Sequence, residues 1–176
     1  MLDEFIAKVS TELQQQGYLV ELSPRIPGVQ AWLYARSPHR VRLGVARVED
    51  HFLFVDWDNS VFGRLDQLIE VYRRFSSFVN RGFRTPHVLR MQIPNLAVVA
   101  VSQKEFPDDA VRFARTTSLT PWYGGEVGQV ILVEIENMQM ISLDSLNTGR
   151  SPRFGAFALG HAAEIIWAVS LRVFKS

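Results

Sequence analysis

Two aspartates, Asp56 and Asp58, stand at the end of an apolar run and just before a long helical pattern. Strand ends that open onto loops are where sheet proteins assemble sites, and hard divalent metals prefer carboxylate oxygens. The pair is therefore a candidate for catalytic residues. The alternative is a turn in which Asp58 or Asn59 caps the following helix, and this alternative, which we favour, explains the same residue types.

Two glutamates, Glu134 and Glu136, alternate along a predicted strand and therefore point to the same face of it. Together with Asp56 they would form a three-carboxylate site for Mg²⁺ or Mn²⁺ if the two strands are neighbours. The alternative is the solvent face of an edge strand, where charges discourage aggregation. The sequence leaves both interpretations open, and we expect no cofactor unless the metal site forms.

Basic residues are concentrated in one stretch, with six between Val71 and Lys104 and no acidic residue among them. Four of these are candidates for binding phosphate groups, namely Arg73, Arg74, Arg81 and Arg84. The alternative is that arginines near the end of a helix complement its dipole and solvate its outer face. We favour this second interpretation because the formal net charge of the whole chain is only +1.

The composition indicates a folded cytoplasmic protein. Hydrophobic residues make up 47% of the 176 residues and charged residues 21%, which is ordinary globular usage. The absence of cysteine excludes disulfides, thiolate metal sites and cysteine nucleophiles, and it suits a reducing compartment. The acidic start of the chain at Asp3 and Glu4 does not resemble a secretory signal. The length fits a single domain over residues 1–176.

Hydrophobic periodicity predicts an α/β fold with helices between strands. The predicted helices are 2–16, 61–80, 107–115 and 156–173, and the predicted strands are 18–20, 30–36, 40–48, 51–57, 96–101 and 129–135. Glu49 and Asp50 are predicted to form the turn of a hairpin. The stretch 154–171 approaches membrane-spanning length, but His161 and Glu164 would lie near its centre, where charge is costly. We therefore expect a core helix or an oligomer interface rather than a membrane span.

The order helix, strand, hairpin, helix, strand, helix, strand resembles the core of the restriction-endonuclease-like superfamily, particularly its Mrr-type members. Residues 13–21, with the Gly17-Tyr18 pair, resemble its first helix passing into its first strand. Residues 97–102 and 106–114 resemble a later strand followed by a short alanine-containing helix. The resemblance covers about residues 3–136 and implies a three-layer core with a mixed central sheet flanked by helices. An apolar C-terminal helix, about 154–174, would be an extension to that core.

The catalytic signature of the family is missing at the matching positions. Active members use an acidic residue and a Glu/Gln-x-Lys sequence on the next strand, because two ligands hold a metal and the lysine supports the attacking water. Here Gln30 and Gly44 stand where the ligands belong, and Arg47 stands where the lysine belongs. Because arginine stays protonated, it does not readily transfer protons.

We therefore predict a non-catalytic α/β binding or interaction module on a nuclease-like fold. It would associate with itself or with a protein partner through the apolar C-terminal helix. The alternative is a metal-dependent nuclease or phosphodiesterase with relocated carboxylate ligands. A weaker alternative is nucleic-acid binding without cleavage.

Overall fold

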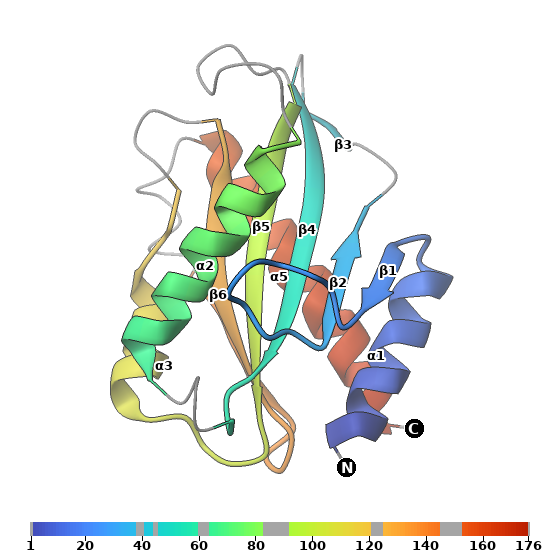
Figure 1. Ribbon diagram of the computed structural model, residues 1–176, viewed down its shortest axis with the longest axis vertical. Coiled ribbons are helices and arrows are strands. Elements are labelled where there is room, and N and C mark those ends of the chain that lie inside the picture. Colours follow the sequence, from blue (N-terminus) through green and yellow to red (C-terminus); the bar gives the residue numbers. More distant parts are fainter. Residues whose placement is uncertain are drawn as a thin grey trace.

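The computed structural model describes residues 2–37, 41–43, 46–59, 64–82, 92–120, 125–144 and 153–175. Figure 1 shows how the helices and strands of these residues are arranged. In chain order they are α1 (Leu2–Gln15), β1 (Leu19–Leu22), β2 (Leu33–Arg36), β3 (Val41–Leu43), β4 (Ala46–Asp56), α2 (Leu65–Asn80), β5 (Gln92–Ser102), α3 (Asp108–Thr116), β6 (Val127–Glu134), β7 (Gln139–Ile141) and α5 (Arg153–Lys175).

The seven strands form one sheet with the order β1-β2-β4-β5-β6-β7, and β3 pairs with β4 outside this path. The pairs β1–β2, β2–β4 and β6–β7 are antiparallel, whereas β4–β5 and β5–β6 are parallel. Parallel neighbours need a crossover, and the segments that contain α2 and α3 supply the two crossovers here. The predicted α/β class, with a mixed central sheet flanked by helices, is confirmed. The relationship to the nuclease-like superfamily stays a prediction.

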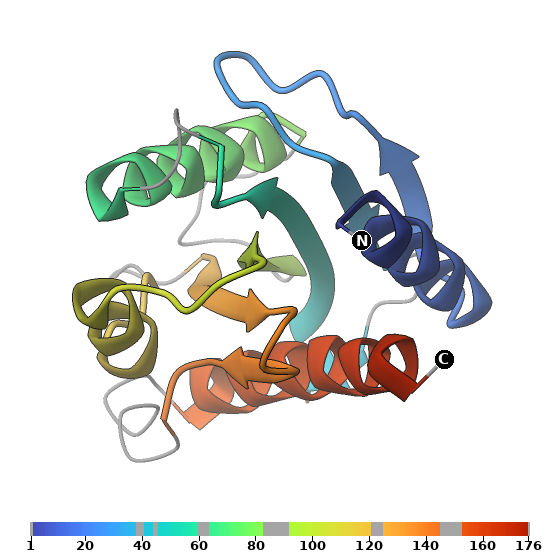
Figure 2. The ribbon, with the colours of Figure 1, turned by 90° about the horizontal axis from the view of Figure 1, so that it is seen from below.

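Helices cover both faces of the sheet, with α2 and α3 on one face and α1 and α5 on the other (Figure 2). Side chains of β4 alternate between the two cores. Leu53 and Val55 are buried under α2 and α3, and Phe52 and Phe54 are buried under α1 and α5. Because β4, β5 and β6 are buried on both faces, the sequence shows an apolar run in each, at 52–55, 96–101 and 130–133.

The C-terminal helix α5 belongs to the core of the fold. Six of its apolar side chains are buried, namely Ala158, Leu159, Ala162, Ile166, Val169 and Val173. Its last turns lie beside α1, where Phe174 stacks on Phe5 with ring centroids 5.7 Å apart. Within the described residues, no helix is long and apolar enough to cross a membrane. The apolar character of α5 is therefore explained largely by its packing on the sheet.

The prediction of a strand at 40–48 followed by a turn at Glu49 and Asp50 is wrong. The chain reverses earlier, because β3 and β4 pair with Arg42 opposite Arg47. Glu49 and Asp50 therefore lie inside β4, with 8% and 3% of their surface exposed. Two adjacent acidic residues are typical of a turn, but here buried hydrogen bonds replace the water that they lose. The short strand β7 was not predicted, and α2 begins at Leu65 rather than at residue 61.

Gly128 marks a close approach between β6 and α2. A Cβ atom at this position would lie 1.7 Å from the Tyr72 hydroxyl, whereas a Cβ at Gly160 in α5 would meet nothing within 4 Å. We expect Gly128→Ala to lower the free energy of unfolding by about 1–3 kcal/mol, because the packed ring must move. We expect Gly160→Ala to raise it by roughly 0.5–1 kcal/mol through helix propensity. Urea unfolding measures both, and equal effects of the two substitutions would contradict this packing.

Candidate functional site

A pocket of about 380 Å³ lies beside the carboxyl end of β4. Its lining includes Ser23, Gln30, Trp32, Asp56 and Asn59, and we call it the Asp56 pocket. A backbone hydrogen bond joins the segment before β2 to β4 at this pocket, because the Trp32 amide donates to the Phe54 carbonyl over 2.9 Å. In open α/β sheets the carboxyl ends of parallel strands are the usual place for ligands.

The Asp56 side chain closes a turn and also faces this pocket. Its Oδ1 accepts hydrogen bonds from the backbone amides of Asp58 and Asn59, at 2.9 and 3.2 Å. Partial burial raises the pKa of Asp56, the two amides lower it, and the carboxylates of Asp58 and Asp3 raise it further. The charged groups that shift this pKa are therefore both negative. A turn after β4 holds Asp56, as expected, but the predicted cap is wrong, because the N-cap of α2 is Arg64 rather than Asp58 or Asn59. The local electrostatics make Asp56 a place for positive charge.

Asp58 has a structural role in the same turn. Its Oδ1 accepts a hydrogen bond from the Ser102 hydroxyl and its Oδ2 accepts one from the Gln103 amide, both at 2.7 Å. These bonds connect the turn after β4 to the end of β5. Both oxygens of Asp58 are thus already engaged.

The structure does not bring Asp56, Glu134 and Glu136 together. The strand β5 separates β4 from β6, and alternation places Asp56 on the α1 and α5 side but Glu134 on the α2 and α3 side. Glu134 is 4% exposed and accepts a hydrogen bond from the Phe106 amide, whereas Glu136 lies exposed beyond the end of β6. Among the described residues, no group of three histidine or acidic side chains could hold a metal ion.

The residues matched to the catalytic signature of the family also lie far apart in the structure. Gln30 lines the Asp56 pocket, whereas Arg47 lies near the start of β4. Asp56 is nine residue steps along the extended strand from Arg47, which corresponds to about 30 Å. Gly44 lies outside the described residues. The matching failed because the predicted strand 40–48 combines β3 with the beginning of β4.

The four candidate arginines belong to the end of α2 and the residues after it. Arg73 and Arg74 are exposed, and both contact the same carboxylate, Glu70, at 3.9 and 2.9 Å. Arg74 also donates to the Gly28 carbonyl over 3.3 Å. Arg81 is the last cap residue of α2, and Arg84 lies outside the described residues. One glutamate therefore partly neutralises two of these four cations.

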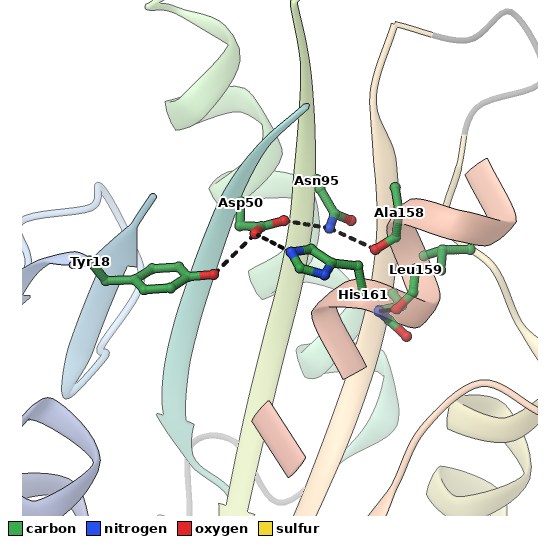
Figure 3. Close-up of polar contacts among 7 residues, drawn as sticks. Tyr18, Asp50, Asn95, Ala158, Leu159 and His161 are labelled. Atoms are coloured by element: carbon green, nitrogen blue, oxygen red, sulfur yellow. Dashed lines mark hydrogen bonds and ion pairs between the residues drawn. The ribbon is translucent and has the colours of Figure 1, made fainter. Parts of the chain in front are cut away.

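Sequence reasoning missed a buried polar cluster under α5, which Figure 3 shows. Asp50 accepts hydrogen bonds from the Tyr18 hydroxyl at 3.1 Å and from the Asn95 amide at 2.7 Å, and His161 lies 3.5 Å away. The Asn95 amide also reaches the Ala158 carbonyl of α5 at 2.8 Å. A run of three polar residues inside an eleven-residue apolar strand was the signal that could have revealed it. We interpret the cluster as an anchor between α5 and the sheet.

The neighbours of Asp50 in β4, Glu49 and His51, face the opposite side, toward α2. The His51 Nδ1 atom lies 2.7 Å from the Tyr34 hydroxyl, as in a base beside a nucleophile. Burial, followed by the charge of Arg36, lowers the pKa of His51 to about 3, and burial raises the pKa of Tyr34 to about 12. So weak a base cannot activate so weak an acid, and this pair is not an activated nucleophile.

No protein-family model, curated protein or solved structure matches the chain. The Asp56 pocket and the polar segment 49–51 are therefore interpreted from their own chemistry. The pocket contains a carboxylate, Asp56, and the charged groups of the described residues that shift its pKa are acidic. The segment contains buried charges and dipoles on both faces of the sheet.

The Asp50 anchor can be tested by removing one of its members at a time. We expect Asp50→Ala to destabilise the fold by roughly 3–5 kcal/mol, because Tyr18 and Asn95 lose their partner in a buried place. Tyr18→Phe removes one neutral donor and should cost about 1 kcal/mol. Urea unfolding followed by circular dichroism gives both values. Near-equal costs would show that Asp50 is not the centre of the cluster.

Proposed function

We propose that the protein is a non-catalytic binding module on a nuclease-like α/β core, and that its Asp56 pocket receives the cationic part of a ligand. The observation that carries the proposal is the charge of this pocket. Asp56 faces the cavity, Asp58 and Asp3 add negative potential, and among the described residues neither Arg nor Lys lines it. A cation in the pocket would relieve this repulsion.

If the core is nuclease-like, the lining of the Asp56 pocket is consistent with a loss of cleavage. Gln30 stands beside the end of β4, so the residues nearest to the expected signature are Gln30 and the Asp56-Trp57-Asp58 segment. A neutral amide then replaces one carboxylate, and an aspartate replaces the lysine. Asp58 is already bonded to Ser102 and Gln103, so it does not substitute for a lysine that orients water.

The two kinds of ligand that would fit this pocket both carry positive charge and hydrogen-bond donors. An ammonium group of an organic molecule fits Asp56, with the Gln30 and Asn59 amides and the Trp32 ring nearby. A hydrated divalent cation is the other source of the same chemistry. The volume of about 380 Å³ is at the lower end for small-molecule sites.

We expect a saturable rise in the thermal unfolding midpoint with one of three probes, namely Mn²⁺, Mg²⁺ or 1,4-diaminobutane. A ligand at ~100 times its dissociation constant adds about 2.7 kcal/mol, which corresponds to several degrees for a domain of this size. Asp56→Asn should abolish the rise while keeping the turn, because the amide oxygen accepts the same two backbone hydrogen bonds. Glu136→Gln, an exposed site outside the pocket, is the matched control.

The thermal shifts with the three probes distinguish an organic cation from a metal ion as the ligand. A rise with 1,4-diaminobutane alone identifies an organic cation, and a rise with Mn²⁺ identifies a metal and calls for nuclease assays on the same sample. Cleavage of DNA that is lost in Asp56→Asn would overturn the non-catalytic proposal. A protein indifferent to all three probes would overturn the cation site.

Self-association through α5 stays a prediction, and the structure limits where it would occur. Trp167 is the large exposed hydrophobic side chain of the described part of α5, at 41% exposure. We expect light scattering at micromolar concentration to give twice the chain mass, and Trp167→Glu to give a monomer. Leu22→Glu, at a 60% exposed position on the edge strand β1, is the control. A wild-type monomer, or dissociation caused by the control instead, would exclude α5 as the interface.

A further inference from the structure

A second pocket, of about 370 Å³, lies on the α2 side of the sheet near the start of β4. Tyr34, Arg36, Glu49, His51 and Gln92 supply its polar wall, and α2 supplies an apolar one. It opens on the opposite face of β4 from Asp56. Asp56 is seven residue steps along the strand from Glu49, or about 23 Å. We call this cavity the Glu49 pocket.

Glu49 and His51 are two residues apart on one strand, so both side chains point toward this pocket. They are 8% and 3% exposed. The Glu49 Oε1 and His51 Nε2 atoms are 3.4 Å apart, yet this buried nitrogen forms no hydrogen bond with the described residues. A buried polar atom without a hydrogen bond calls for an explanation, such as an ion at that place.

The spacing of these two atoms suits a metal ion. Imidazole nitrogen and carboxylate oxygen bind Zn²⁺ at about 2.0–2.1 Å. Two such bonds ending on atoms 3.4 Å apart enclose an angle of about 110°, which is the tetrahedral value. A direct hydrogen bond would instead bring the atoms to roughly 2.7–2.9 Å.

The remaining polar atoms of both side chains are held by neighbours, as the outer shell of a metal site requires. His51 Nδ1 is 2.7 Å from the Tyr34 hydroxyl, so a proton on Nδ1 leaves a lone pair on Nε2, the atom that lies 3.4 Å from Glu49 Oε1. The Gln92 amide donates a hydrogen bond to Glu49 Oε2. Both candidate ligands are therefore oriented before an ion arrives.

Among the described residues, Arg36 is a cation that competes with a metal ion for Glu49. Its Nε atom lies 4.0 Å from Glu49 Oε1, and its side chain is 49% exposed at the rim. In the metal-free protein Arg36 partly balances the charge of Glu49. Because the guanidinium is half in solvent, it can turn outward and pair with an anion that accompanies the ion.

We propose that Glu49 and His51 form a binding site for a divalent transition ion of the Zn²⁺ class. Mixed imidazole and carboxylate ligands favour Zn²⁺, Co²⁺ and Ni²⁺ over Mg²⁺ and Ca²⁺. The described residues supply two ligands, so the other positions go to water or to a molecule in the pocket. The ion is thus exchangeable, unlike one closed in by four protein ligands.

The test uses the full chain, stripped of metal, with Zn²⁺ alone as the titrant in calorimetry. One equivalent should bind saturably, and Co²⁺ should give the intense visible absorption of a tetrahedral site. His51→Gln and Glu49→Gln should each abolish saturable binding. Tyr34→Phe removes only the outer-shell hydrogen bond and should weaken binding roughly 10–100-fold.

The chain supplies a matched control in His161, a second histidine that lies beside a carboxylate, Asp50. His161→Gln should bind Zn²⁺ as the wild type does. If a substitution prevents folding, long-range ¹H–¹⁵N spectra of the wild-type protein show whether Zn²⁺ shifts the ¹⁵N resonance of His51 Nε2. No saturable binding, or binding lost in His161→Gln but kept in His51→Gln, would overturn the proposal.

Discussion

The rest of the structure depends on the position of β4 in the middle of the sheet. This strand pairs with β2 on one side and with β5 on the other, and helices cover both of its faces. A polar side chain in such a strand loses its water and must find partners in the protein. Glu49, Asp50 and His51 stand together there, so hydrogen bonds had to be supplied on both faces at once.

The partners of these three residues come from distant parts of the chain, and they determine how the outer elements dock. Tyr18 and Asn95 reach Asp50 from the residue before β1 and from β5. Asn95 and Gln129 continue to the Ala158 and Leu159 carbonyls of α5, at 2.8 and 2.7 Å. Apolar contacts alone would allow an apolar helix to slide or turn on the sheet. The two amide contacts instead specify where α5 lies along it.

Sequence periodicity predicted the elements whose stabilising contacts are local. The stripe of α2 and the apolar runs of β5 and β6 are visible because each repeats a simple pattern. Gly17 was expected to end α1, and its φ of +85° is the conformation that glycine favours there. The segment 49–51 could not be predicted in this way. Its polar residues match a turn locally, and the Tyr18 partner that buries Asp50 is 32 residues away.

The sequence identified individual residues of the candidate sites, but it did not show which of them lie close together. Asp56 and Gln30 were each named from the sequence, yet they were assigned to different sites because the register of β2 on β4 was unknown. Once Leu33 is paired with Phe54 and the Trp32 amide is bonded to the Phe54 carbonyl, both candidate residues line one pocket. Glu134 failed to join them because the period of two on β6 points it to the other face. Which face a carboxylate occupies depends on where the strand begins, and that boundary is the least certain feature of a sequence pattern.

Two pockets at opposite ends and on opposite faces of one strand need not communicate. Coupling between sites requires an element with two arrangements whose balance both ligands change. β4 is a poor candidate for such an element, because its pairing with β5 runs without a break from Arg47 to Asp56. The buried bonds of Asp50 hold the middle of the strand from the α5 side as well. The fold therefore favours independent occupation of the Asp56 and Glu49 pockets, with β4 acting as a rigid support that positions a carboxylate for each.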